Sequence, residues 1–200
     1  MKKTKIKDVK VLAKTRFLSL YNAKYENKNG KEKNWTIASR KGTEILNETL
    51  IQGAEDKVDA VVIVAFHKRE KKLVLVKQFR VPINDYIYEL PAGLVDEGEE
   101  SIVSLTRELK EETGLDIVDI IPGLGRDKVY LSPGMTDESV NLVYCICDGE
   151  LSKDGLEEDE DIEPLLISKE EAKAILQSDS KIDIKCLMVL QSFIDINIDI

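Results

Sequence analysis

A glycine-bounded segment, residues 93–115, most constrains what this chain of 200 residues can fold into. Between positions 101 and 113, apolar residues fall at 102, 103, 105 and 109, and charged residues occupy the opposite face. Apolar spacing of three to four residues is typical of an amphipathic helix. Gly114 follows it and can adopt the left-handed conformation common just after a helix. The segment therefore predicts a helix that packs one face against a core.

Three carboxylates of this predicted helix share one face. Glu108, Glu111 and Glu112 stand at i, i+3 and i+4, a spacing at which like charges repel each other. A hard divalent cation would neutralise them, because such cations prefer carboxylate oxygens. Gly93 would let the backbone approach closely, so that a neighbouring main-chain carbonyl joins the same site. From these residues alone, an ordinary charged helix surface is the alternative.

The spacing within the segment also resembles a known family. Glu99 follows Gly93 after five residues, and residues 107–115 (RELKEETGL) follow after seven more. The whole segment resembles the Nudix box at every position that the box defines. The resemblance implies an α+β Nudix fold, in which a mixed β-sheet forms an α/β/α sandwich. It also implies hydrolysis of a nucleoside diphosphate linked to another moiety, with Mg²⁺ or Mn²⁺ as cofactor.

The segments on both sides of the box resemble the ADP-ribose pyrophosphatases of this family. Residues 75–80 (LVKQFR), 88–93 (YELPAG) and 132–138 (SPGMTDE) carry this resemblance, and Pro133 lies 18 residues after Leu115. The implied activity is Mg²⁺-dependent hydrolysis of ADP-ribose, or a related ADP-sugar, to AMP and ribose 5-phosphate. Another nucleotide sugar, such as GDP-mannose or an ADP-hexose, is the alternative substrate. An ADP-ribose-sensing module without turnover is the alternative of a different class.

The resemblance also implies roles for single residues. The implied metal ligands are the Ala92 carbonyl, Glu108, Glu111, Glu112 and Glu160. The implied structural positions of the box are Gly93, Glu99, Arg107 and Gly114. An Arg107 guanidinium bound to Glu99 would preorganise the helix. Glu111 has an alternative role, in which it only hydrogen-bonds the adjoining loop.

Attack of water on a pyrophosphate also requires a general base. The acidic run 157–161 lies where the ADP-ribose pyrophosphatases carry their base, so the expected catalytic residues are Glu158 as the base and Glu112 at the metal. A merely solvated charge run is the alternative. Glu138 is a rival base, although its position better matches a hydrogen bond to the terminal ribose.

Substrate recognition should use aromatic faces for adenine and cations for phosphates. Trp35, in a segment that ends at Arg40, resembles the adenine-stacking position of the relatives, and Phe17 on the preceding strand resembles their second. A hairpin core is the alternative for both aromatic residues. The complete set of expected substrate contacts is Phe17, Trp35, Arg40, Arg80, Leu94, Ser132, Gly134 and Glu138.

The remaining patterns complete an α+β chain. Alternating residues at 8–26 and 33–40, around a turn at 28–31, predict an N-terminal antiparallel hairpin. Further strands are expected at 60–66, 73–79, 86–90, 117–121, 128–131, 139–147 and 165–167, with His67 in a surface turn. Later helices are expected at 168–177, opened by a capping box, and at 183–194. We expect an N-terminal β extension for stacking and dimerisation (1–55) and a Nudix hydrolase domain (56–200).

Composition limits the partners and the compartment. The net charge of −9 argues against a general nucleic-acid binder, whose surface would be basic. Three cysteines, an odd number, favour a reducing cytoplasmic environment. No apolar run is long enough to span a bilayer, so we expect no membrane contact. The family resemblance implies a nucleotide-sugar substrate and a homodimer formed through the N-terminal hairpin.

Overall fold

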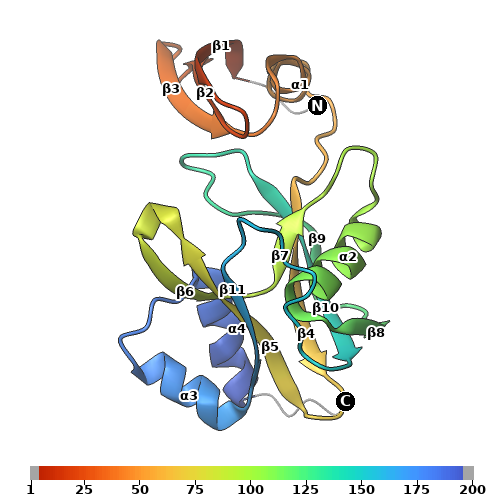
Figure 1. Cartoon of the computed structure of the whole chain (residues 1–200). Helices are drawn as coiled ribbons and strands as arrows, with labels where there is room; N and C mark the ends of the chain where they lie inside the picture. Colours follow the sequence, from red (N-terminus) through yellow and green to blue (C-terminus); the bar gives the residue numbers. More distant parts are fainter. Residues whose placement is uncertain (1–4, 196–200) are drawn as a thin grey trace. The chain divides into compact units, whose positions relative to one another are not determined.

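The computed structural model describes residues 5–195, which form two compact units (Figure 1). The first unit contains the chain up to Asp59 together with residues 129–140, and the second contains the remainder. The expected α+β class, with an N-terminal antiparallel β extension and a larger sheet covered by helices, is confirmed.

The first unit is a three-stranded antiparallel sheet with one helical segment. Its strands pair in the order β1 (Ile6–Lys14), β2 (Ser19–Glu26) and β3 (Glu32–Ser39). A short helix, α1 (Thr43–Leu46), continues as the π-helical turn η1 (Asn47–Gln52). Its core consists of Val9, Tyr21, Ala23 and Leu46.

The predicted two-stranded hairpin is wrong in one respect, because residues 8–26 form two strands. They separate at a turn in which the Leu18 N–H donates to the Thr15 hydroxyl oxygen at 3.1 Å. Alternation of apolar and polar residues runs through this turn, so the period of two did not reveal it. Helix α1 and η1 were also not predicted, although Leu46 is fully buried beneath the sheet.

The second unit is built on a larger sheet with strands in the order β11-β5-β4-β10-β8, to which β6, β7 and β9 add at the sides. The bounds of these elements are β4 (Ala60–His67), β5 (Lys72–Arg80), η2 (Val81–Ile83), β6 (Asp85–Glu89), β7 (Ala92–Leu94), α2 (Ser101–Thr113), β8 (Asp116–Ile120), β9 (Arg126–Tyr130), β10 (Ser139–Asp148), β11 (Ile162–Ile167), α3 (Lys169–Gln177) and α4 (Ile184–Asp195). All the strands expected after residue 59 are present, and β7 is an addition. The predicted capping box of α3 is formed by Ser168 and Glu171.

Strand β4 is buried on both faces, which explains its uninterrupted apolar sequence. On one face, Val61, Ile63 and Ala65 join a core cluster with the apolar side of α2. On the other face, the Phe66 ring lies 6.0 Å from the ring of Phe193 in α4, measured between centroids. Helices therefore cover both faces of the sheet, as the sandwich prediction requires.

His67 is not at the surface, which corrects the prediction from the charged turn beside it. It is the last residue of β4, and its side chain is 2% exposed. Its Nδ1 accepts from the Glu70 N–H at 3.1 Å, so Nε2 carries the proton and donates to the Gly149 carbonyl at 3.1 Å. Both ring nitrogens are therefore satisfied internally, and the imidazole anchors the β4–β5 turn.

In the described part of the chain, no helix is long and apolar enough to cross a membrane.

Candidate active site

The site is organised by α2, whose predicted bounds are confirmed. Leu105 and Leu109 anchor one side of the helix in the core. The helix ends at Gly114, which has a φ of 77° and donates its N–H to the Lys110 carbonyl at 2.9 Å. A Cβ at this glycine would lie 2.7 Å from the Ser152 backbone nitrogen, so both conformation and space require glycine. These contacts fix the direction in which the acidic face points.

Two carboxylates of that face are buried. Glu108 and Glu112 are 8% and 4% exposed, which excludes an ordinary solvated helix surface for these two residues. Burial raises the pKa of Glu112 to about 8, against a hydrogen bond from the Ala92 N–H at 3.0 Å that lowers it. Burial also raises the pKa of Glu108, although its neighbour Arg107 opposes the change. The charge of Glu108 also raises the pKa of Glu112, so this desolvated pair favours either protonation of a carboxylate or binding of a cation.

Gly93 provides the space that Glu108 occupies. It lies in β7, where it pairs with Val61 of β4. A Cβ added at Gly93 would fall 1.8 Å from Cδ of Glu108 and about as close to both carboxylate oxygens. A side chain at position 93 and the Glu108 carboxylate therefore cannot coexist in this arrangement.

Arg107 connects the helix to the loop before it. Its Nη2 donates to Glu99 at 3.1 Å and to the Leu94 carbonyl at 3.0 Å, and its Nε donates to Glu99 at 3.3 Å. Its Nη1 donates to Glu108 at 2.7 Å and to Glu111 at 3.0 Å. The Arg107 hydrogen bonds, followed by that of Ser104, lower the pKa of Glu99 to about 2.

Ser104 completes this network and was not predicted from the sequence. It is fully buried, and its hydroxyl donates to Glu99 at 2.6 Å. A serine within an amphipathic helix carries no spacing signal that distinguishes such a role from an ordinary polar position. Only the fold of the preceding loop brings Glu99 to it.

The carboxylates fit a divalent cation chemically. Glu108 and Glu112 supply buried oxygen donors, and the space opposite Gly93 admits the Glu108 carboxylate. Glu111 is 44% exposed and bound to Arg107. Among residues 5–195, no group of three or more His, Cys, Asp or Glu side chains converges as a ready-made metal cluster. The structure thus shows a buried pair of donors, with Arg107 bound to Glu108 and Glu111.

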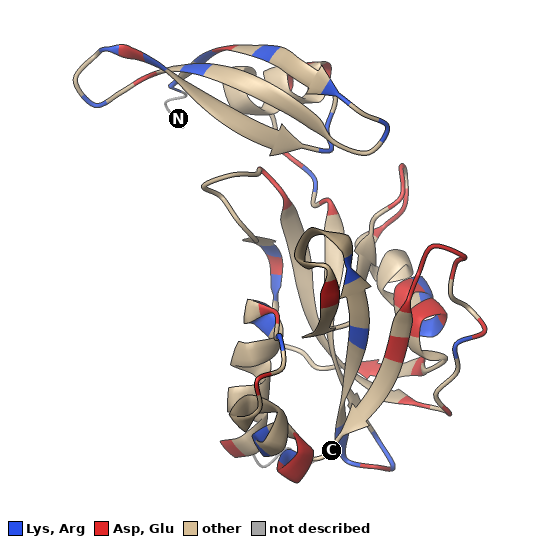
Figure 2. Ribbon diagram, turned by 60° about the vertical axis from the view of Figure 1, so that its left-hand side comes forward, with Lys and Arg blue, Asp and Glu red and all other residues tan. Residues whose placement is uncertain are grey.

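The acidic loop before β11 lies against α2, and Figure 2 shows acidic residues on both segments. A Cβ at Gly155 would lie 2.7 Å from Cα of Glu111, so the loop backbone touches the helix. Glu160 is close enough that its charge raises the pKa of both Glu108 and Glu112. The charge of Glu160 therefore acts on the buried pair, whereas Glu158 is exposed to solvent.

The far end of this loop is held by a residue that the sequence analysis missed. The Tyr86 hydroxyl of β6 donates to the Asp161 carboxylate, and the Phe79 N–H donates to the Asp161 carbonyl at 3.0 Å. Nothing in the local sequence links positions 86 and 161, which approach because β6 and β11 both pair with β5.

Arg80 already has an anionic partner within the chain. Its Nε lies 3.1 and 3.2 Å from the two carboxylate oxygens of Glu89, a residue of the neighbouring strand β6. The Arg80 side chain is 44% exposed, so part of it remains accessible to solvent. The charge of Glu112 also acts on Arg80, so this cation lies near the buried carboxylates.

Five of the expected substrate-binding residues come together in the first unit. The Trp35 indole N–H donates to the Gly134 carbonyl at 3.2 Å, and Arg40 Nε lies 3.4 Å from Glu138 Oε1. Ser132 accepts backbone hydrogen bonds from the turn that leads to Glu138. Strand β3 from Trp35 onward and Arg40 after it are thus joined to the loop 132–138, although about 100 residues separate them in sequence.

Phe17 and Trp35 are not core residues, so the alternative of a packed hairpin core is wrong for both. Phe17 is 66% exposed and Trp35 is 51% exposed. Phe17 lies in the turn between β1 and β2 rather than on a strand, and the Arg16 guanidinium lies 4.8 Å from its ring centroid. Leu94, a further expected substrate contact, is 44% exposed, and its carbonyl accepts from Arg107.

Two curated proteins are similar to this chain in sequence. An ADP-ribose pyrophosphatase of Bacillus subtilis is 36% identical over 126 residues, covering 61% of this chain and 65% of that protein. An ADP-ribose pyrophosphatase of Saccharomyces cerevisiae is 33% identical over 138 residues, covering 68% of this chain and 54% of that protein. The chain thus spans less than two thirds of the length of these curated relatives.

The fold has a counterpart among solved structures. A crystal structure of an ADP compounds hydrolase has a TM-score of 0.66 at 19% sequence identity, covering 93% of this chain and 89% of that chain. The family model of the NUDIX domain matches residues 56–186, which include the helix, the buried carboxylates and the acidic loop. The chain therefore belongs to the Nudix family.

Proposed function

We propose that this chain is a divalent-cation-dependent pyrophosphatase that hydrolyses ADP-ribose to AMP and ribose 5-phosphate. The observation that carries the proposal is the buried pair Glu108 and Glu112, held opposite Gly93. Two relatives named ADP-ribose pyrophosphatase support the choice of substrate. A location in the cytoplasm, inferred from cysteine content, stays a prediction.

The proposed cofactor is Mg²⁺, with Mn²⁺ as a substitute. Its proposed donors are the Ala92 carbonyl, Glu108 and Glu112, with Glu111 and Glu160 as further carboxylates. When bound, the cation would polarise the pyrophosphate and lower the pKa of the attacking water. The chain's own contribution is to keep two carboxylates desolvated and to fix their helix through Arg107, which preorganises the site.

For the general base we retain Glu158, on the exposed acidic loop. The loop touches α2 at Gly155 and is held at Asp161, so a short arc between these contacts carries Glu158. Glu138 is the rival. Its contact with Arg40 favours a role in holding the sugar side of the substrate, because this ion pair fixes the position of the carboxylate.

The N-terminal extension, residues 1–55, is proposed to stack the adenine and to form a homodimer, and residues 56–200 to be the hydrolase domain. Exposed apolar side chains on or beside the N-terminal sheet support an interface there. These residues are Val11, Leu12, Phe17, Leu18, Leu20 and Trp35.

The substrate assignment is tested with a panel of ADP-ribose, ADP-glucose, GDP-mannose, NADH and diadenosine polyphosphates. Each compound is incubated with Mg²⁺, and phosphate released by an added phosphatase is measured. We expect ADP-ribose to give the highest kcat/KM. A higher value for another compound would reassign the substrate, and no turnover of any compound would favour a sensing module.

The base is tested by replacing Glu158 and Glu138 separately with glutamine. Loss of a general base costs about 10²- to 10⁴-fold in rate, so Glu158→Gln should lower kcat by at least about 100-fold. Glu138→Gln should mainly raise KM for ADP-ribose. Steady-state kinetics of both variants distinguishes the two candidates. A loss of only a few-fold in kcat for Glu158→Gln would contradict its assignment as the base.

A further inference from the structure

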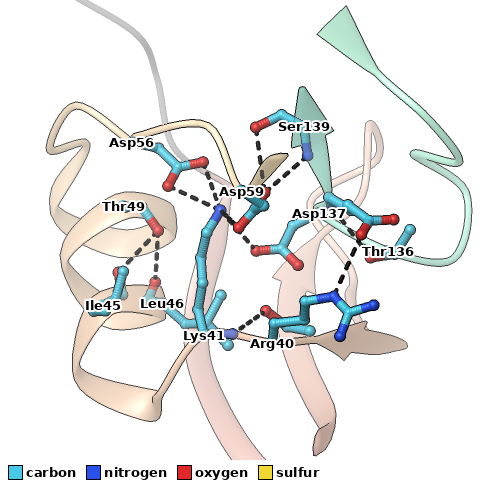
Figure 3. A network of polar contacts seen from close by, with 12 residues as sticks. Arg40, Lys41, Ile45, Leu46, Thr49, Asp56, Asp59, Thr136, Asp137 and Ser139 are labelled. Atoms are coloured by element: carbon cyan, nitrogen blue, oxygen red, sulfur yellow. Dashed lines mark hydrogen bonds and ion pairs between the residues drawn. The ribbon is translucent and has the colours of Figure 1, made fainter. Parts of the chain in front are cut away.

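A buried ammonium group in the first unit contacts three carboxylates (Figure 3). Lys41 Nζ lies 2.9 Å from Asp56, 3.3 Å from Asp59 and 3.3 Å from Asp137. The Lys41 side chain is 10% exposed, and none of the three aspartates exceeds 22%. Buried ion networks of this kind are sensitive to loss of one member, because the remaining charges stay desolvated.

The backbone of Lys41 is fixed from the sheet side. The hydroxyl of Tyr21, a buried residue of β2, donates to the Lys41 carbonyl at 2.8 Å. The Lys41 N–H donates to the Ser39 hydroxyl oxygen at 3.1 Å. The ammonium therefore projects from a rigid position at the end of β3.

The partners of Lys41 come from two other segments. Asp56 and Asp59 follow η1, whereas Asp137 belongs to the loop 132–138. Asp59 also binds Ser139, the residue that follows the loop. The Ser139 N–H donates to the Asp59 carboxylate at 2.8 Å, and the Asp59 N–H donates to the Ser139 carbonyl at 2.8 Å. The network thus holds the chain on both sides of Glu138.

The charge balance of the network keeps Lys41 ionised. Burial lowers the pKa of Lys41, but the hydrogen bond to Asp56 and the charges of the three aspartates outweigh burial and raise it. One ammonium faces three carboxylates, so removing it would leave repelling charges on the two segments. Asp137 would then be repelled electrostatically by Asp56 and Asp59.

The earlier half of the loop is held independently of Lys41. The Ala38 N–H donates to the Met135 carbonyl at 2.9 Å, and the Trp35 indole N–H donates to the Gly134 carbonyl. Loss of Lys41 should therefore loosen residues 137–139, while residues 134–136 keep their own contacts.

We propose that Lys41 is a positioning residue for Glu138, which it fixes beside Arg40 by anchoring Asp137 and, through Asp59, Ser139. This inference rests on the proposed function for the role of Glu138 on the sugar side of the substrate. Arg40 Nε lies 3.4 Å from Glu138 Oε1, and the anchored residues Asp137 and Ser139 hold the backbone on both sides of Glu138. Lys41 itself contacts no substrate in this role.

The kinetic test compares Lys41→Met and Asp137→Asn with Lys24→Met as control. Lys24 is a partly exposed lysine of β2, paired with Glu32 at 2.7 Å. Both anchor variants should raise KM for ADP-ribose by about tenfold, a change of about 1.4 kcal/mol in binding, with kcat within threefold. The inhibition constant of AMP, which lacks the sugar phosphate, should not change. Equal loss of kcat and of AMP affinity would overturn the positioning role.

The double variant tests whether both residues act through one path. If Lys41 acts on Glu138 through Asp137, Lys41→Met with Asp137→Asn should be no worse than Lys41→Met alone. Additive losses in KM would show that the two side chains act separately. Asp137→Asn leaves Lys41 paired with Asp56 and Asp59, so it keeps the test valid if Lys41→Met does not fold.

Amide hydrogen exchange gives a readout that needs no turnover. In Asp137→Asn and Lys41→Met, the Ser139 and Asp59 amides should exchange faster, whereas the Ala38 amide should keep its protection. Unchanged exchange at Ser139 would overturn the proposal whatever the activity. Faster exchange at Ser139 in a chain that hydrolyses none of the panel compounds would uphold the anchoring and refute the proposed function.

Discussion

At the scale of single residues, the unusual feature is that two acids of a charged helix are removed from water. Burial of Glu112 favours its neutral form and raises its pKa to about 8. In the absence of metal, the folded chain therefore binds this proton between about pH 4.5 and 8, whereas the unfolded chain has released it. The metal-free fold should lose stability as pH rises through this range.

Glu112→Gln should remove the part of this pH dependence that Glu112 contributes, because glutamine does not titrate, and should leave the smaller part that the raised pKa of Glu108 contributes. The slope attributable to one proton is at most about 1.4 kcal/mol per pH unit. Urea unfolding of the metal-free protein at several pH values between 5 and 8 measures it. Glu111→Gln, at a position that is 44% exposed, is the matched control and should retain the slope. A wild-type stability that is flat across this range would contradict the assignment.

At the scale of elements, the site depends on how closely β7 and α2 approach. The glycine at position 93 and the carboxylate at position 108 occupy adjoining space, so the strand and the helix fit only as this pair. The acidic loop adds a third element, which touches α2 at Gly155 and is held at Asp161 by β6. Strand β7, the helix α2 that follows it and the later acidic loop thus meet around one small volume.

Gly93→Ala should displace the Glu108 carboxylate, since the added Cβ would lie 1.8 Å from its Cδ. We expect Mg²⁺ affinity to fall by about tenfold or more, which corresponds to about 1.4 kcal/mol, while the fold persists. Titration calorimetry with Mg²⁺ measures the affinity, and circular dichroism checks the fold. Gly42→Ala is the control, because a Cβ there meets nothing within 4 Å. Undiminished Mg²⁺ affinity in Gly93→Ala would remove Glu108 from the metal site.

At the scale of the whole molecule, the net charge of −9 conceals an uneven distribution. Residues 93–115 carry a net −5 and residues 150–163 a net −7, whereas the first fifty residues carry +8. The acidic share lies on α2, its preceding loop and the loop beside it, where a cation would convert it into a site for a phosphate-rich substrate. The overall acidity is therefore compatible with an anionic substrate.

The proposed homodimer predicts complementation between inactive chains. If each adenine site is completed by the partner's N-terminal extension, a mixed dimer of Trp35→Ala and Glu112→Gln chains contains one intact site. Random mixing would then restore about a quarter of wild-type activity, because half of the dimers are mixed and each has one working site of two. Activity after refolding a mixture is the measurement, and each variant refolded alone is the control. No recovery, or a fully active monomer in gel filtration, would exclude the shared site.

The sequence by itself determined the local elements and the chemical character of the site. Helix 101–113 and its glycine cap follow from apolar spacing, and the box residues follow from fixed intervals, because both signals are local in the chain. It did not reveal the turn at 15–18, the helix after residue 43, or the burial of His67. The turn lies within an uninterrupted alternation of apolar and polar residues, whereas the helix and His67 depend on neighbours distant in sequence.

Only the tertiary structure decided which charges act together. Burial of Glu108 and Glu112 requires the core beneath α2, and the Lys41 network requires three segments to meet at the end of β3. The physical reason is that desolvation and Coulomb interactions depend on distances in space, which the order of residues along the chain does not specify. Local spacing identified the acidic face, and the packing around it set the protonation and the partners of its members.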